Sequence, residues 1–103
     1  SKITLSKIPE NVTFINPEVF RGCTGITTMI IPPNITGIGY RAFEYCEALT
    51  EVTIQGASVG IYSDVFSFCP NLTTINVPWS EGEVADAPWG ATNATINYNY
   101  TGE

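Results

Sequence analysis

Apolar and polar residues alternate in short segments that recur along this chain. In residues 49–54 the apolar residues have the spacing L-x-x-L-x-L, and the end of the segment alternates apolar and polar side chains. A period of two is typical of a strand with one buried face. Segments 26–31 and 72–77 have the same pattern, so we predict equivalent strands in all three places.

The interval between these segments is 23 residues, and many other positions keep it. The columns include Phe20, Phe43 and Phe66; Cys23, Cys46 and Cys69; Ile15, Ile38 and Ile61; and Ile8, Ile31, Ile54 and Val77. Internal repeats of this length indicate a solenoid, in which each coil buries its apolar face against its neighbours. We therefore predict one domain over residues 1–103, with coils at about 3–25, 26–48, 49–71 and 72–94.

Each coil also has signals for a short helical turn before its cysteine. In the first coil Asn16 is a favoured N-cap, Pro17 is a favoured first helical residue, and Glu18 suits the positive end of a helix. Residues 63–66 have similar signals. The expected fold is thus of the α/β class but rich in β, with a parallel concave sheet on one side and short helical turns on the other.

The last coil keeps the period but changes its chemistry. Val84 and Trp89 fall where the columns predict apolar residues, so we expect Trp89 to be buried, but Thr92 replaces the cysteine. Residues 78–83 add charge and turn-forming residues. A solenoid needs such a polar end, because its final coil has no neighbour. We therefore predict a C-terminal cap over about residues 78–103.

These residues resemble the BspA-like type of leucine-rich repeat. The string I-P-P-N-I-T-G-I-G-Y-R-A-F-E-Y-C-E-A-L at 31–49 closely follows that family's pattern, and the similarity covers residues 3–77. The resemblance implies a right-handed leucine-rich-repeat solenoid. It also implies a cell-surface or secreted protein, mostly bacterial, that adheres to host proteins or other cells. The first coil departs from the pattern at Ser6 and Asn16, and the third departs from it at Tyr62.

Composition removes several functional classes. The net charge of −6 opposes binding to nucleic acid or to an anionic membrane surface. No apolar run approaches the ~20 residues that span a bilayer. Histidine is absent, which removes the commonest general base and metal ligand. We therefore expect no enzymatic activity, no metal and no cofactor.

Three motifs suggest chemistry but have simpler structural explanations. Residues 56–60 match G-x-S-x-G, but the hydrolase elbow needs a histidine. One cysteine per coil fits packed thiols better than the paired spacing of a zinc site. The acidic cluster of Glu81, Glu83 and Asp86 lacks a calcium-loop pattern, and we interpret it as a solvated cap.

The outward positions of the strands form the candidate interaction surface, because solenoids bind through extended concave faces. The proposed partner-contacting residues are Thr28, Ile30, Glu51, Thr53, Gln55, Thr74, Asn76 and Trp79, preceded in the first coil by Leu5 and Lys7. A solvated ladder of cross-strand threonine pairs explains most of them equally well. Trp79 is either an exposed anchor or a cover for the final strand.

Two functions follow from these observations. The first is a non-catalytic, adhesin-like module of an extracellular or cell-surface protein, whose partner is a host or other cell-surface protein. The alternative is a structural role, as the C-terminal repeats and cap of a longer solenoid whose binding site lies elsewhere. Nothing before Ile3 covers the first coil, so we expect a monomer or a weak homodimer through that uncapped end.

Overall fold

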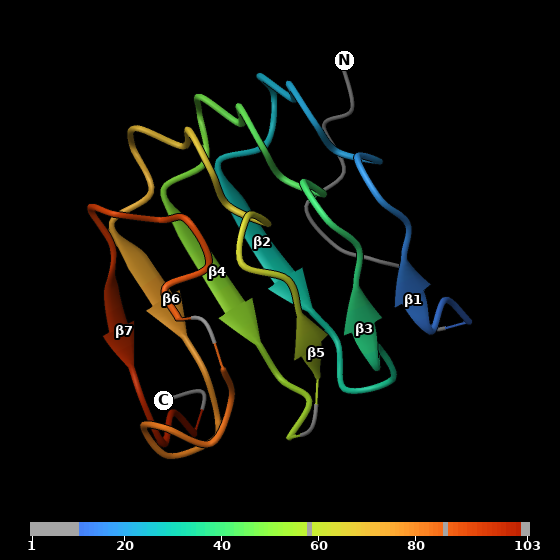
Figure 1. The fold of residues 1–103 in the computed structure, drawn as a ribbon, viewed down its shortest axis with the longest axis vertical. Coiled ribbons are helices and arrows are strands. Elements are labelled where there is room, and N and C mark those ends of the chain that lie inside the picture. The colour runs from blue at the N-terminus through green and yellow to red at the C-terminus, as the bar shows by residue number, and fades with distance from the viewer. Residues whose placement is uncertain (1–10, 58, 86, 102–103) are drawn as a thin grey trace.

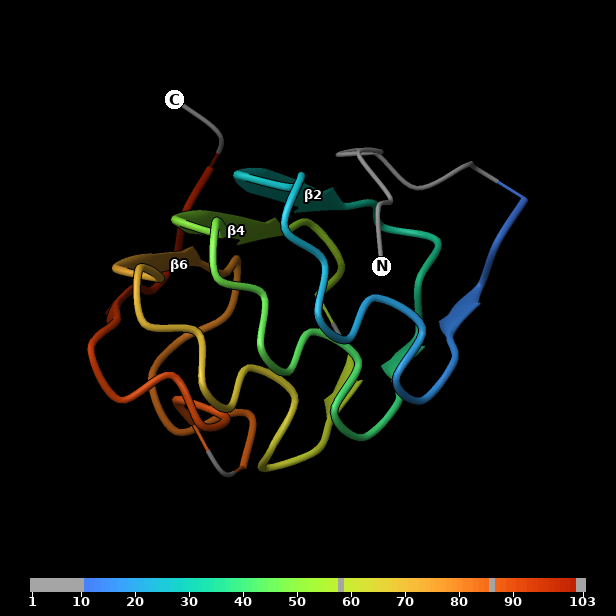
Figure 2. The same cartoon turned by 90° about the horizontal axis from the view of Figure 1, so that it is seen from above.

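A computed structural model describes residues 11–57, 59–85 and 87–101 of the chain, which wind through successive coils of similar shape (Figures 1 and 2). The strands form two parallel sheets. One sheet contains β2 (Thr28–Ile31), β4 (Glu51–Ile54), β6 (Thr74–Asn76) and β7 (Thr95–Asn97), in that order. The other contains β1 (Phe14–Ile15), β3 (Gly37–Ile38) and β5 (Gly60–Ile61). The predicted β-rich parallel solenoid is confirmed.

The register of both sheets follows the sequence repeat. Met29 lies opposite Val52, which lies opposite Ile75. Each of these side chains is at most 1% exposed, so the apolar columns read from the sequence face the core. From β1 to β6 the pairing is between residues one period apart, so each of these coils hydrogen-bonds to the next.

The sequence pattern did not predict β1, β3 and β5, the strands of the second sheet. Ile15, Ile38 and Ile61 were recognised as an apolar column, and the structure places each of them in a two-residue strand. Two residues are too few to show an alternating pattern. These strands therefore exist because of pairing between coils, which no local signal in the sequence reports.

The predicted short helical turns are wrong, because no helix occurs in the described part of the chain. The backbone N–H groups there donate alternately within a coil and to the next coil. Val19 and Arg21 donate to carbonyls three residues earlier, whereas the intervening Phe20 donates to Ala42 of the following coil, over 2.9 Å. Residues 43 and 66 repeat this arrangement. In an α-helix every such donor would bond within its own coil. Hydrogen bonds between coils therefore determine the backbone here, and the local capping preferences do not produce a helix.

The core is a ladder of rings and thiols that runs through the coils. The Phe20 and Phe43 rings stack with centroids 5.1 Å apart, and those of Phe43 and Phe66 are 5.5 Å apart. Trp89 continues the column as expected: its side chain is fully buried, and its carbonyl accepts the Phe66 N–H. Aromatic contacts of this kind contribute about 1 kcal/mol each beyond area burial.

The C-terminal segment adds a strand that the fixed period missed. Residues 95–97 repeat the Thr-Ile-Asn of 74–76 after 21 residues instead of 23, and β7 pairs with β6 in that register. Beyond β7, the Tyr100 N–H donates to the Val77 carbonyl. The end of the chain therefore covers the last coil partly by extending the same sheet.

Candidate interaction site

The structure presents most of the predicted partner-contacting residues on one surface. We define the sheet face as the outward side chains of β2, β4 and β6 and of Gln55, which follows β4. Thr28 and Gln55 are exposed, and Ile30 is an apolar side chain with 42% of its surface accessible. Glu51, Thr53 and Thr74 are half-buried. Leu5 and Lys7 lie outside the described residues.

Asn76 is not available to a partner, because it is buried in a hydrogen-bonded cluster. Its Nδ2 donates to Glu51 Oε2 over 2.8 Å and to Thr53 Oγ1 over 3.0 Å, and its Oδ1 accepts from Asn97 Nδ2 over 2.7 Å. Only 1% of its surface is exposed. The cluster brings together three residues proposed as contacts, and its effect is to fasten β7 to the preceding strands.

Trp79 is also buried, with 4% of its surface exposed. Its ring meets the Trp89 ring edge to face at a centroid distance of 6.1 Å. Of the two roles considered for Trp79, the structure agrees with the cover for the final coil and not with the exposed anchor. The sheet face therefore consists of Thr28, Ile30, Glu51, Thr53, Gln55 and Thr74.

A second exposed surface was missed in the sequence. Tyr45 and Phe68 lie in the turns that lead to β4 and β6, and their rings stack nearly parallel with centroids 4.9 Å apart. The Arg21 guanidinium lies 5.2 Å from the centre of the Tyr45 ring. We call these three residues the aromatic row. Phe68 is 63% exposed and Tyr45 is 42% exposed, although large apolar side chains normally avoid this much contact with water.

The backbone of the aromatic row is also unfavourable for aromatic residues. Tyr45 has φ of 62° and Phe68 has φ of 59°, in the left-handed region. The equivalent position in the first coil is Gly22, with φ of 76°. Glycine adopts this conformation without strain, whereas other residues lose about 1–2 kcal/mol there. Glu18, Arg41 and the buried Trp89 also have positive φ, so this conformation recurs in the turns, and Tyr45 and Phe68 are distinguished by having exposed, stacked rings there. A signal was present in the sequence, since both rings follow the phenylalanine column by two residues.

Ion pairs between coils flank this surface. Arg21 Nε lies 2.6 Å from Glu44 Oε1, and the hydrogen bond to that carboxylate raises the pKa of Arg21. Glu44 is itself buried, with 7% of its surface exposed. Arg41 pairs with Asp64 over 3.5 Å. The contact with Glu44 holds the guanidinium of Arg21 beside the Tyr45 ring.

The remaining motifs have structural roles or lie outside the described residues. Cys23, Cys46 and Cys69 are buried and form no disulfide. In the described ranges no group of three or more acidic or thiol side chains is placed to hold a metal ion. The serine of the G-x-S-x-G motif and Asp86 of the acidic cluster are not described. The described residues form no helix that is long and apolar enough to cross a membrane.

Comparison with known families gives a match that spans most of the chain. The family model described as a BspA type leucine-rich-repeat region matches residues 1–88 in six copies. No curated protein and no solved structure matches the chain significantly.

Proposed function

Because the chain belongs to the BspA-type leucine-rich-repeat family, we propose that it is a non-catalytic, adhesin-like module that binds a protein on the surface of a host or other cell. Repeats of this type are typical of surface proteins, which supports an extracellular or cell-surface location. The observation that carries the proposal is the aromatic row, where exposed rings occupy backbone positions that favour glycine.

The aromatic row has the properties of a binding anchor. Stacked aromatic rings with few rotatable bonds lose little conformational entropy when a partner covers them, and aromatic and arginine side chains dominate the energetics of many interfaces. The sheet face contributes Ile30 as a further exposed apolar side chain. Together they offer a partner two surfaces of different chemistry.

Replacing Phe68 with asparagine tests this proposal. Asparagine tolerates the left-handed conformation, so the relieved strain of about 1–2 kcal/mol offsets the lost ring contact of about 1 kcal/mol. The variant should unfold at an unchanged urea concentration, while binding to host cells, measured by flow cytometry, falls at least tenfold. Tyr62→Asn is the matched control, because Tyr62 is 56% exposed but lies outside the aromatic row.

The sheet face is tested in the same assay with Ile30→Glu. A loss of binding in this variant alone would place the contact on the sheet face and remove it from the aromatic row. Full binding by both folded variants would contradict both surfaces. No binding by the unmodified protein to any host cell or cell-surface protein would favour the alternative, a structural set of repeats within a longer solenoid.

A further inference from the structure

The smaller sheet stops one coil before the larger sheet does. The Thr13 carbonyl accepts the Thr36 N–H over 2.8 Å, and the Thr36 carbonyl accepts the Gly60 N–H over 3.1 Å. The equivalent carbonyl in the third coil belongs to Val59, and no described residue donates a hydrogen bond to it. The edge of β5 that faces the fourth coil is therefore open.

A local turn explains why the fourth coil does not pair. By the 23-residue period, Glu83 is equivalent to Gly60. However, the Glu83 N–H donates to the Ser80 carbonyl over 3.1 Å, and its carboxylate accepts the Ser80 N–H over 2.9 Å. Gly82, with φ of 92°, permits this tight turn. The donor that would continue the sheet is thus used within the cap.

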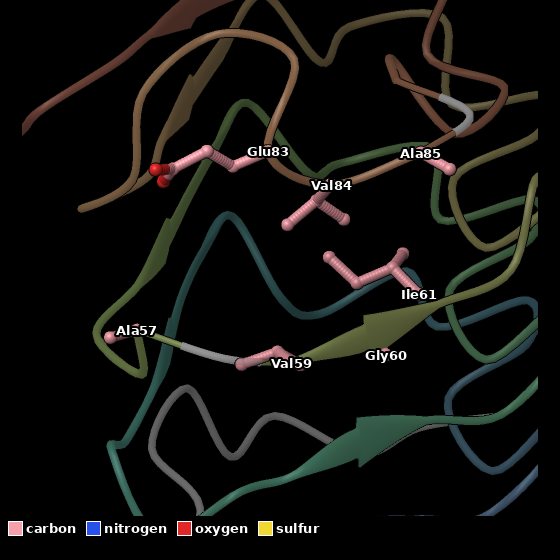
Figure 3. Close-up of a pocket in the computed structure, with 7 residues that line it drawn as sticks. All are labelled: Ala57, Val59, Gly60, Ile61, Glu83, Val84 and Ala85. Carbon is pink, nitrogen blue, oxygen red and sulfur yellow. The ribbon is translucent and has the colours of Figure 1, made fainter.

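A groove of about 730 Å³ lies between β5 and the cap. Its lining residues are Ala57, Val59, Gly60, Ile61, Glu83, Val84 and Ala85. Figure 3 shows the Ile61 and Val84 side chains facing each other across it. Known binding pockets have volumes of about 300–1,000 Å³. Its lining side chains are aliphatic apart from Glu83, but polar atoms make up the larger share of its exposed surface, and the unpaired backbone of β5 forms one wall.

The direction of the backbone groups at this wall defines what fits. Gly60 directs its N–H toward β3, and successive residues of a strand direct their N–H and C=O groups to opposite edges. The N–H and C=O of Ile61, and the C=O of Val59, therefore point to the open edge. Val59 and Ile61 are only 5% and 8% exposed, and buried backbone groups nearly always have hydrogen-bond partners. An extended peptide supplies these partners at strand spacing.

We infer that this groove binds an extended peptide segment of a partner, which adds to β5 as a parallel fourth strand. The peptide donates an N–H to the Val59 carbonyl, as Gly60 donates to Thr36, and accepts the Ile61 N–H. Small and aliphatic side chains suit the aliphatic side chains of the lining, and the peptide backbone suits its polar atoms. This site is separate from the aromatic row and the sheet face, so it does not depend on the proposed function.

The chain itself supplies a probe, because β3 already pairs with β5 on the other edge. The probe is a blocked peptide of residues 34–40, Asn-Ile-Thr-Gly-Ile-Gly-Tyr. Titrated into the labelled protein and followed by NMR, it should shift the amide signals of Val59, Ile61 and Val84. Hydrogen exchange of the Ile61 amide should slow at least tenfold at saturation.

Methylated peptides provide the decisive control. Methylation of the nitrogens equivalent to Thr36, which donates to Thr13 in β3 itself, and to Gly37, which matches the Gly60 donor of β5, removes both N–H groups that can face Val59, and should abolish binding. Methylation at the next residue, equivalent to Ile38, alters the opposite edge and should leave the affinity within about threefold. Equal affinities for the two peptides, or no shift at Ile61 up to millimolar peptide, would overturn the inference. If hydrogen exchange of the Ile61 amide slows with rising protein concentration in the absence of peptide, a second copy of the chain fills the groove. That result would also overturn the inference.

Discussion

Each of the two later thiols of the cysteine column points at a carbonyl of the coil before it. Cys46 Sγ donates to the Phe20 carbonyl over 3.1 Å, and Cys69 Sγ donates to the Phe43 carbonyl over 3.0 Å. A cysteine at this position therefore fills space as a small apolar residue and also gives a second donor to a carbonyl that already accepts a backbone N–H. Alanine would fill less space and donate nothing, which explains why the residue suits the interior of a coil.

The surroundings of Cys46 also predict a pH dependence of stability. The interaction with the neighbouring Cys69 thiol, followed by burial, raises the pKa of Cys46 above its ordinary value of 9.0, and the same interaction lowers the pKa of Cys69. When the folded pKa is the higher one, the unfolded state releases its proton first, so the contribution is complete below about pH 9 and is lost as the pH rises further. The free energy of unfolding should fall between pH 9 and 10.5 by up to about 1.4 kcal/mol per pH unit.

Urea unfolding of the reduced protein between pH 7 and 10.5 measures this effect. Cys46→Ala is the comparison, because it lacks the titrating group. It should be less stable by about 1–2 kcal/mol at pH 7, and its stability should fall less steeply above pH 9. Parallel curves for the two proteins would show that Cys46 does not titrate differently in the folded state.

Among the turns between strands, the one at Gly39 fixes how closely two coils approach. A Cβ atom at Gly39 would lie 2.4 Å from the Pro17 nitrogen and 2.7 Å from its Cα. Both are backbone atoms of the preceding coil, so no side chain can rotate to make room. The Gly39 N–H also donates to the Ile15 carbonyl over 2.7 Å, which connects β1 to the coil that contains β3.

We predict that Gly39→Ala destabilises the fold by about 3 kcal/mol, at the upper end of the usual range for overpacking. The physical reason is that the two coils must separate, which weakens the pairing of β1 with β3. Gly60→Ala is a matched control from the same sheet, because its Cβ would lie 3.9 Å from the nearest atom, the Thr36 carbonyl oxygen. Chemical denaturation should show a loss of less than 1 kcal/mol for the control. Similar losses in the two variants would contradict the close approach of the coils.

At the scale of elements, the sequence predicted those strands whose own residues carry a pattern. β2 and β4 have four residues each, with strictly alternating buried and more exposed positions, and their period matches the repeat. β7 was not predicted because it follows β6 after 21 residues instead of 23, although its Thr-Ile-Asn sequence is the same as that of β6. The prediction of short helices was wrong because Asn16 and Pro17 indicate only a local preference. In the structure every second N–H of this segment donates to the neighbouring coil.

The candidate site was predictable in position but not in detail. Alternation along the strands identified the outward positions, including the exposed Ile30. It did not reveal that β7 would lie beside Asn76, because that contact depends on the unpredicted strand. The aromatic row was hidden for a different reason. Its significance lies in the stacking of two exposed rings from successive coils, a contact that residue type does not indicate.

The molecule as a whole is acidic, and the positive charges in its described part are paired with carboxylates. The sequence has ten acidic and four basic residues. Both arginines in the described part of the chain pair with a carboxylate of the next coil. A partner therefore meets a field that is negative over most of the described surface, apart from the apolar rings. Such a field steers cationic partners toward the protein and slows the approach of polyanions.

The predicted consequence is a salt-dependent association rate with the cell-surface partner. If that partner presents a basic surface, the association rate constant should fall by about tenfold between about 50 and 500 mM salt, because screening removes the long-range attraction. The dissociation rate should change little, since the aromatic contacts are short-range and apolar. Surface plasmon resonance measures the two rates separately. Glu81→Lys, an exposed change in the cap, makes the net charge less negative by two and should flatten the salt dependence without altering dissociation. An association rate that increases with salt, or measurable binding to heparin at 150 mM salt, would contradict steering by the acidic surface.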